Sequence, residues 1–155
     1  MSDPTDPALI HREMAIASHN RSWTLIDADT RDADADAELL ASAFASWWHW
    51  HQVGTAENKA LADHQVAKVL ALVGDGEPSL RYARRAMAAA EREGWTDWKL
   101  VACHEGMARA YACVEDEEGR EHHLRAAAAL LPELDGEDVA VLEPQLAEIP
   151  GWPPA

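Results

Sequence analysis

The sequence predicts an all-helical protein built from antiparallel helical hairpins. Alanine is abundant, and the alternation of β-branched and aromatic residues typical of strands is missing from a chain with one Phe and two Tyr. Helix breakers also divide the chain into segments joined by short connections, which place successive helices antiparallel. A chain of 155 residues is long enough for one domain, so we expect a single domain over 1–155 with a helical core at about 7–147.

Seven helices are expected in order along the chain. The first two span 7–27 and 33–53, the second beginning within the acidic turn DADTRDADAD. The third and fourth span 56–73 and 77–93, separated by the turn GDGEP, whose Pro78 suits the first turn of a helix. The last three span 96–114, 117–131 and 137–147.

Local signals support these boundaries. Gly94 can end the fourth helix in a left-handed conformation, and Thr96 and Asp97 can cap the fifth. The residues after 147, ending in PGWPPA, predict an extended tail over 148–155 that Trp152 could pin to the core.

An internal repeat indicates how the hairpins are related. AKVLALVGDGEPSLRYARRA (67–86), moved by 41 residues, aligns with ARAYACVEDEEGREHHLRAA (108–127), so that Ala67 meets Ala108 and Ala86 meets Ala127. A small residue at each of these positions lets two helices cross closely. This pattern resembles the tetratricopeptide repeat family, and Pro132 stands where the closing proline of that family stands.

The resemblance covers about 55–131 well and 7–53 more weakly. In the first hairpin, Asn20 and Trp23 would take the slots of Ala67 and Leu70. The run SWWHWHQVG is also similar to bacterial tetratricopeptide-like proteins of unassigned function. The resemblance implies a right-handed superhelical stack of hairpins with a concave groove, and it implies no reaction.

A strip of cations is expected in that groove. Projecting the repeat places Arg21, Lys68 and Arg109 at equivalent groove positions of three hairpins, with His64 and Glu105 in the preceding slot. In a strongly acidic protein such a strip would suit a carboxylate or another anionic group. The alternative is that these are ordinary solvated side chains, neutralised by nearby Asp and Glu.

The second candidate site lies on the second helix. Its three Trp, at 47, 48 and 50, cannot all face one core, because each residue turns the helix by 100°. Ser46, His49 and Trp50 share a face that could bind a ligand by stacking and one polar contact, with Asn20 and Asn58 as nearby amides. The alternative is that the indoles fill the interface between hairpins and His49 makes one structural hydrogen bond.

Composition and motifs exclude several functional classes. Asp and Glu outnumber Lys and Arg by 28 to 13, a net charge of -15, which disfavours nucleic acid and anionic membranes as partners. No apolar stretch approaches the roughly 18 residues of a membrane helix, and the N-terminus is no signal peptide, so we expect a cytoplasmic protein. Nucleotide-binding, nucleophile and metal-ligand motifs are missing, so we expect no cofactor, metal or catalytic residue.

These observations favour a binding protein over an enzyme. The leading hypothesis is a concave groove that accepts a protein or peptide partner, one carrying an anionic group if the cation strip is used. A small-molecule or enzymatic pocket near His49 and Trp50 is the second hypothesis. The third is a self-associating structural protein, a homodimer formed through exposed Trp.

Overall fold

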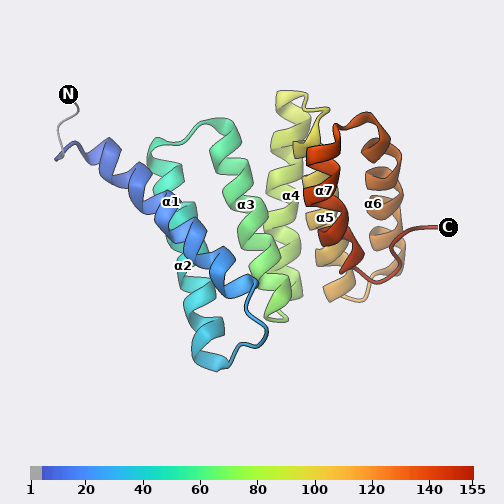
Figure 1. The fold of residues 1–155 in the computed structure, drawn as a ribbon, viewed down its shortest axis with the longest axis horizontal. Helices are drawn as coiled ribbons and strands as arrows, with labels where there is room; N and C mark the ends of the chain where they lie inside the picture. The colour runs from blue at the N-terminus through green and yellow to red at the C-terminus, as the bar shows by residue number, and fades with distance from the viewer. Residues whose placement is uncertain (1–4) are drawn as a thin grey trace.

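The computed structural model describes residues 5–155, and over that range it contains helices and no strands, which confirms the all-helical prediction (Figure 1). Every predicted helix is present, with ends within two residues of those expected. The helices are α1 (Pro7–Ile26), α2 (Ala33–Val53), α3 (Ala56–Leu72), α4 (Gly76–Glu93), α5 (Trp98–Cys113), α6 (Glu117–Leu130) and α7 (Gly136–Ala147), with a short 3-10 helix, η1 (Leu131–Glu133), before α7.

The helices form three hairpins that follow one another along the long axis of the molecule. The pairs α1 and α2, α3 and α4, and α5 and α6 pack most extensively within themselves, and α2 with α3 and α4 with α5 join the pairs. Figure 1 shows α7 lying across α5 at the C-terminal end. Antiparallel hairpins therefore pack side by side, and a seventh helix folds back onto them.

The turns between successive helices explain why the chain reverses where it does. Gly94 ends α4 with φ +69°, the left-handed conformation that the sequence predicts. Gly74 has φ +89° and Glu115 has φ +60°, and these two residues are equivalent in the 41-residue repeat. The same left-handed turn therefore occurs in both repeats. In the first it is formed by glycine, and in the second by Glu115, for which this conformation is strained.

Helix starts follow local rules. Aspartate side chains cap α1, α2, α5, α6 and α7, and Thr55 and Asn58 form a reciprocal capping box at the start of α3. Because Asp97 accepts a hydrogen bond from the backbone N–H of Lys99, α5 begins at Trp98 rather than at Thr96.

Small buried residues mark the helix crossings of the second and third hairpins. Ala67, Ala86, Ala108 and Ala127 are each at most 1% exposed, as the aligned repeat predicts. In the first hairpin the corresponding residue is Ser22, which is fully buried and lies 2.9 Å from the Ser42 hydroxyl of α2, measured between the two Oγ atoms.

This arrangement corrects the expected register of the first helix. The sequence alignment put Asn20 in the crossing slot, but Asn20 is exposed and the crossing lies two residues later, at Ser22. A hydroxyl that bonds across the crossing can replace alanine there, which a search for small apolar residues does not anticipate. The shift places Trp23, and not Arg21, at the position equivalent to Lys68.

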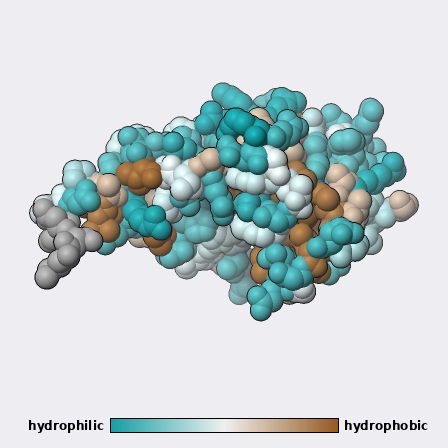
Figure 2. Space-filling view, turned by 90° about the horizontal axis from the view of Figure 1, so that it is seen from above, coloured by the Kyte–Doolittle hydropathy of each residue, from teal (hydrophilic) through white to brown (hydrophobic). Residues whose placement is uncertain are grey.

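The tail and the surface complete the fold. Trp152 packs against the C-terminal core of α5, α6 and α7, as expected. Exposed apolar side chains gather on the projecting end next to the N-terminus (Figure 2), and they include Ile10, Met14 and Trp48, which is 51% exposed. Within residues 5–155, no helix combines the length and the apolar character needed to cross a bilayer.

Candidate functional site

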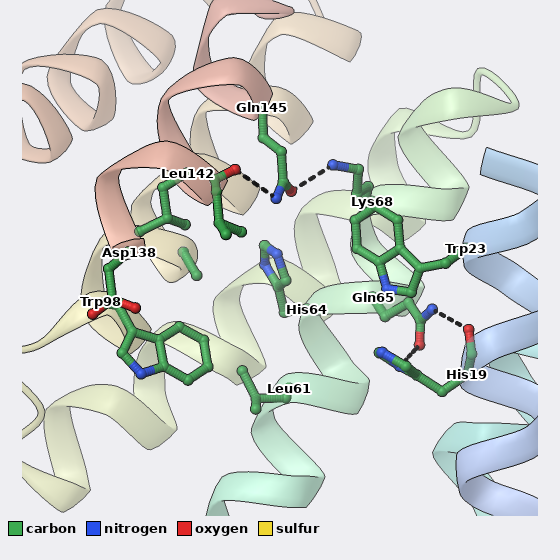
Figure 3. A pocket seen from close by; sticks show the side chains of 12 residues that line it. His19, Trp23, Leu61, His64, Gln65, Lys68, Trp98, Asp138, Leu142 and Gln145 are labelled. Atoms are coloured by element: carbon green, nitrogen blue, oxygen red, sulfur yellow. Dashed lines mark hydrogen bonds between the residues drawn. The ribbon is translucent and has the colours of Figure 1, made fainter. Parts of the chain in front are cut away.

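A cavity of about 340 Å³ lies between α1, α3, α5 and α7, and we call it the central cavity (Figure 3). Its volume is at the lower end of the range of small-molecule sites. Most of its wall is apolar, with a few polar groups directed inward. Its lining residues are His19, Trp23, Leu61, His64, Gln65, Lys68, Trp98, Ala102, Asp138, Val141, Leu142 and Gln145.

Lys68 is the principal charged group of the central cavity. Its side chain comes from the middle of α3 and is 1% exposed. The ammonium nitrogen donates a hydrogen bond of 2.8 Å to Gln145 Oε1 and lies 5.0 Å from the centre of the Trp23 ring. Gln145 is held in this orientation because its Nε2 donates to the Val141 carbonyl, at 3.1 Å.

No carboxylate of the described residues forms an ion pair with Lys68. An ammonium group has three N–H donors, and here one of them is satisfied by a neutral amide oxygen. The cation–π contact with Trp23 compensates the buried charge only in part. Glu105, Glu148 and Asp27 offset part of the cost of burying the Lys68 charge, but none of these carboxylates forms an ion pair with its ammonium group.

The neighbouring cation, Arg109, forms ion pairs with two carboxylates. Its guanidinium contacts Glu105 on the same helix, at 2.6–2.7 Å, and Glu148, at 3.0 Å. It also donates to the Gln145 carbonyl, at 2.9 Å. Arg109 therefore ties α5 to α7 through Glu105 Oε1 and Glu148 Oε2, whereas Glu105 Oε2 is buried without a hydrogen-bond partner.

These charges shift one another's ionisation. Burial lowers the pKa of Lys68 below its ordinary value, and the positive charge of Arg109 acts in the same direction while Glu105 opposes it. Burial alone would raise the pKa of Glu105, but Arg109 and Lys68 outweigh it and hold that pKa below its ordinary value. Glu105 is thus an ionised carboxylate inside the fold.

His64 lies between this cluster and the cavity. Burial lowers its pKa, so its Nε2, 3.4 Å from Glu105 Oε2, belongs to a neutral ring. Its Nδ1 is buried without a hydrogen-bond partner and faces Gly106 of α5, where a β-carbon would be 2.8 Å away. Glycine at 106 is therefore what lets the imidazole fit between α3 and α5.

A second histidine supports the opposite wall. His19 Nδ1 donates to Gln65 Oε1, at 2.6 Å, and Gln65 Nε2 donates back to the His19 carbonyl, at 3.3 Å. Burial lowers the pKa of His19, which favours a neutral ring. This pair fixes α1 to α3 beside Trp23 and leaves Lys68 as the cationic side chain that lines the cavity.

The structure brings four of the ten predicted site residues together. His64, Lys68, Glu105 and Arg109 form the cluster described above, on adjacent helices α3 and α5. Arg21 does not join them. It forms a two-pronged ion pair with Glu38 of α2, at 2.6 and 3.0 Å, in an exposed position, as the corrected register of α1 requires.

The residues predicted around the second helix are dispersed. Ser46 is fully buried and donates to the Ala15 carbonyl, at 2.9 Å, and His49 Nδ1 lies 2.8 Å from His11 Nδ1. Trp50 and Asn58 line a smaller hollow of about 200 Å³ with His19, but the Asn58 side chain is held in the α3 capping box. Asn20 is exposed and lines none of the described cavities.

Several residues of the central cavity had no signal in the sequence. Trp98 begins α5, and Asp138 and Gln145 belong to α7, so none of the three lies within the aligned segments 67–86 and 108–127. With Ser22 at the crossing, His19 and Trp23 take the positions equivalent to His64 and Lys68, two residues away from the register that the sequence predicted. A search for Ser as well as Ala at helix crossings would have recovered both.

The expected open groove is partly filled by the chain itself. Leu142 and Leu146 of α7 are buried against Val101, Ala102 and Leu124, so that α7 covers the surface of α5 that carries Arg109. What remains is the central cavity. Among residues 5–155, no three His, Cys, Asp or Glu side chains lie close enough to hold a metal ion.

The chain matches no protein-family model, and neither a curated protein nor a solved structure is significantly similar to it. The tetratricopeptide resemblance accordingly stays a prediction, and the function has to be inferred from the central cavity.

Proposed function

We propose that this protein binds a small, largely apolar carboxylate in the central cavity. The observation that carries the proposal is the ammonium group of Lys68, which is buried, faces an apolar cavity and has no ion-pair partner among the described residues. A ligand carboxylate beside Lys68 Nζ would supply the missing anion and accept hydrogen bonds from its two remaining N–H groups.

The walls of the cavity suit the rest of such a ligand. Trp23 and Trp98 come from opposite sides of the cavity (Figure 3), and Leu61, Ala102 and Leu142 are among its other apolar lining residues. Indole faces offer large, rigid contact surfaces for a ring or an aliphatic chain. The volume of about 340 Å³ limits the ligand to roughly the size of an aromatic acid.

A matched pair of probes tests the proposal. 3-Phenylpropanoate and its neutral amide, 3-phenylpropanamide, have nearly the same shape, so calorimetry of both isolates the contribution of the carboxylate. A hydrogen bond between charged groups contributes about 1.5–3 kcal/mol, so wild type should bind the acid roughly tenfold or more tightly than the amide.

Two lysine variants of α3 sharpen this experiment. Lys68→Met should abolish the preference for the acid, whereas Lys59→Met, which removes a cation of the same helix outside the central cavity, should retain it. Circular dichroism checks that both variants remain helical. An unchanged preference in Lys68→Met, or no binding of either probe to wild type at millimolar concentration, would overturn the proposal.

A protein or peptide partner is the alternative that the sequence predicted. It would need the surface of α5 that α7 now covers, or the exposed apolar end at Ile10, Met14 and Trp48, through which a homodimer could also form. Using the α5 surface would require α7 to move away, whereas the central cavity and the exposed apolar end need no such rearrangement. We further propose a cytoplasmic location, supported by the two free thiols, Cys103 and Cys113.

A further inference from the structure

The end of the central cavity away from Lys68 carries a carboxylate. Asp138, in the first turn of α7, lines the cavity beside Trp98, on the opposite side from Lys68 and Trp23 (Figure 3). Its side chain has no ion-pair or hydrogen-bond partner among residues 5–155 that the structure describes. One cavity thus holds an unpaired cation at one end and an unpaired anion at the other.

The spacing of these two charges follows from α7. Gln145, which contacts Lys68 Nζ, lies seven residues after Asp138, and seven residues make two turns of an α-helix. Both side chains therefore lie on the same face of α7, separated by about 10 Å along the helix axis. Leu142 lies between them on that face and contributes an apolar middle.

Neighbouring carboxylates strengthen the negative end. Burial raises the pKa of Asp138, and so do the negative charges of Asp135, Asp97 and Glu137 around it. Together these groups create a local field that attracts a cation. At the other end, the ammonium group of Lys68 supplies positive charge at the cavity wall, partly offset by Glu105, Glu148 and Asp27, none of which forms an ion pair with it.

We propose that the ligand of the central cavity is a zwitterion with its carboxylate and ammonium groups at opposite ends of an apolar spacer, an ω-amino acid in chemical terms. Its carboxylate pairs with Lys68, its spacer lies between Trp23 and Trp98, and its ammonium group pairs with Asp138. An α-amino acid fits less well, because its two charges are adjacent and cannot reach both ends. This inference rests on the proposed carboxylate binding and specifies the other end of the ligand.

A second pair of probes tests the ammonium end alone. 3-(4-Aminomethylphenyl)propanoate and 3-(4-ethylphenyl)propanoate share the carboxylate, the ring and the overall length, and differ in an ammonium group against a methyl group. Calorimetry on wild type should show the aminomethyl compound binding roughly tenfold more tightly. Asp138→Asn should remove this preference while binding the ethyl compound as wild type does.

Glu137→Gln is the matched control. Glu137 is in the same first turn of α7, so removing its charge has a similar effect on the helix dipole, but it does not line the cavity. This variant should keep most of the preference for the aminomethyl compound, because Glu137 is exposed and contributes only a solvent-screened charge from outside the cavity. Equal binding of the two probes to wild type, or an unchanged preference in Asp138→Asn, overturns the zwitterion while carboxylate binding stands. If neither probe binds, or if Lys68→Met binds both as wild type does, carboxylate binding fails as well.

Discussion

Lys68 and Arg109 occupy equivalent positions of the repeat, yet they have different roles because of what faces them. Arg109 has two carboxylates within 3.0 Å and holds α5 to α7. Lys68 has one amide oxygen and an indole ring. Natural proteins retain such local sources of instability mainly at functional sites, where a binding partner compensates them.

Two histidines of the third hairpin, His104 and His123, lie with their Nδ1 atoms 2.9 Å apart, and we expect the fold to be sensitive to acid there. Burial, reinforced by His104 and His122, lowers the pKa of His123 to about 4, and its ring stacks on Tyr111. Since this pKa is below the ordinary value of 6.5, the folded state favours the neutral ring. The stability that this provides is fully present above pH 6.5 and is lost as the pH falls through about 4.

Replacing His123 should therefore flatten the pH dependence of stability. His123→Phe keeps an aromatic ring against Tyr111 and removes the titrating group. Melting temperatures measured between pH 7.5 and 4 should fall less for this variant than for wild type. Parallel curves for the two proteins would show that His123 takes up no proton on unfolding in this range.

At the scale of single elements, α6 approaches α5 more closely than a side chain at 119 would allow. A β-carbon at Gly119 would be 2.6–2.8 Å from three atoms of the Tyr111 ring. Alanine normally favours a helix over glycine by up to about 1 kcal/mol, but overpacking of this kind costs about 1–3 kcal/mol. The cost of the close contact with Tyr111 should therefore exceed the gain in helix propensity from alanine.

Gly119→Ala should consequently lower the free energy of unfolding by about 1 kcal/mol, measured by urea denaturation. Gly136→Ala is the control, because a β-carbon there has no atom within 4 Å. This second variant should be as stable as wild type or slightly more stable. A Gly119→Ala protein more stable than wild type would mean that α5 and α6 are further apart than described.

The helices themselves could be predicted from the sequence because their signals are local. Capping residues such as Asp97 and the turn at Gly94 act within a few residues, and they set the ends of α4 and α5. The register of α1 could not be predicted as well, because it depends on a hydrogen bond between Ser22 and Ser42 of another helix. In the second hairpin Ser79 donates to the Ala67 backbone carbonyl at 2.6 Å, a bond that needs no side chain at 67, so the repeat did not reveal a serine at this position.

At the scale of the whole molecule, the position of α7 decides what kind of site the array presents. Three stacked hairpins alone would leave the surface of α5 exposed, and α7 covers it through Leu142, Leu146 and the contacts of Arg109. The sequence predicted α7 as a helix, but its place depends on contacts between residues 36 to 77 positions apart. The proximity of His64, Lys68, Glu105 and Arg109 was therefore predictable, and the cavity that His64 and Lys68 line together with α7 was not.

If Lys68 is retained for ligand binding, the fold does not depend on its charge. The most direct test is the free energy of unfolding of wild type and Lys68→Met, each measured in urea with and without 3-phenylpropanoate. Replacing a buried charge by an apolar side chain of similar size is often neutral or stabilising. We expect Lys68→Met to be at least as stable as wild type without ligand, and the acid to stabilise wild type alone. The opposite result would be a Lys68→Met protein that loses at least about 2 kcal/mol of stability without ligand and that the acid stabilises as much as it stabilises wild type. That result would show that Lys68 supports the fold and does not bind the carboxylate.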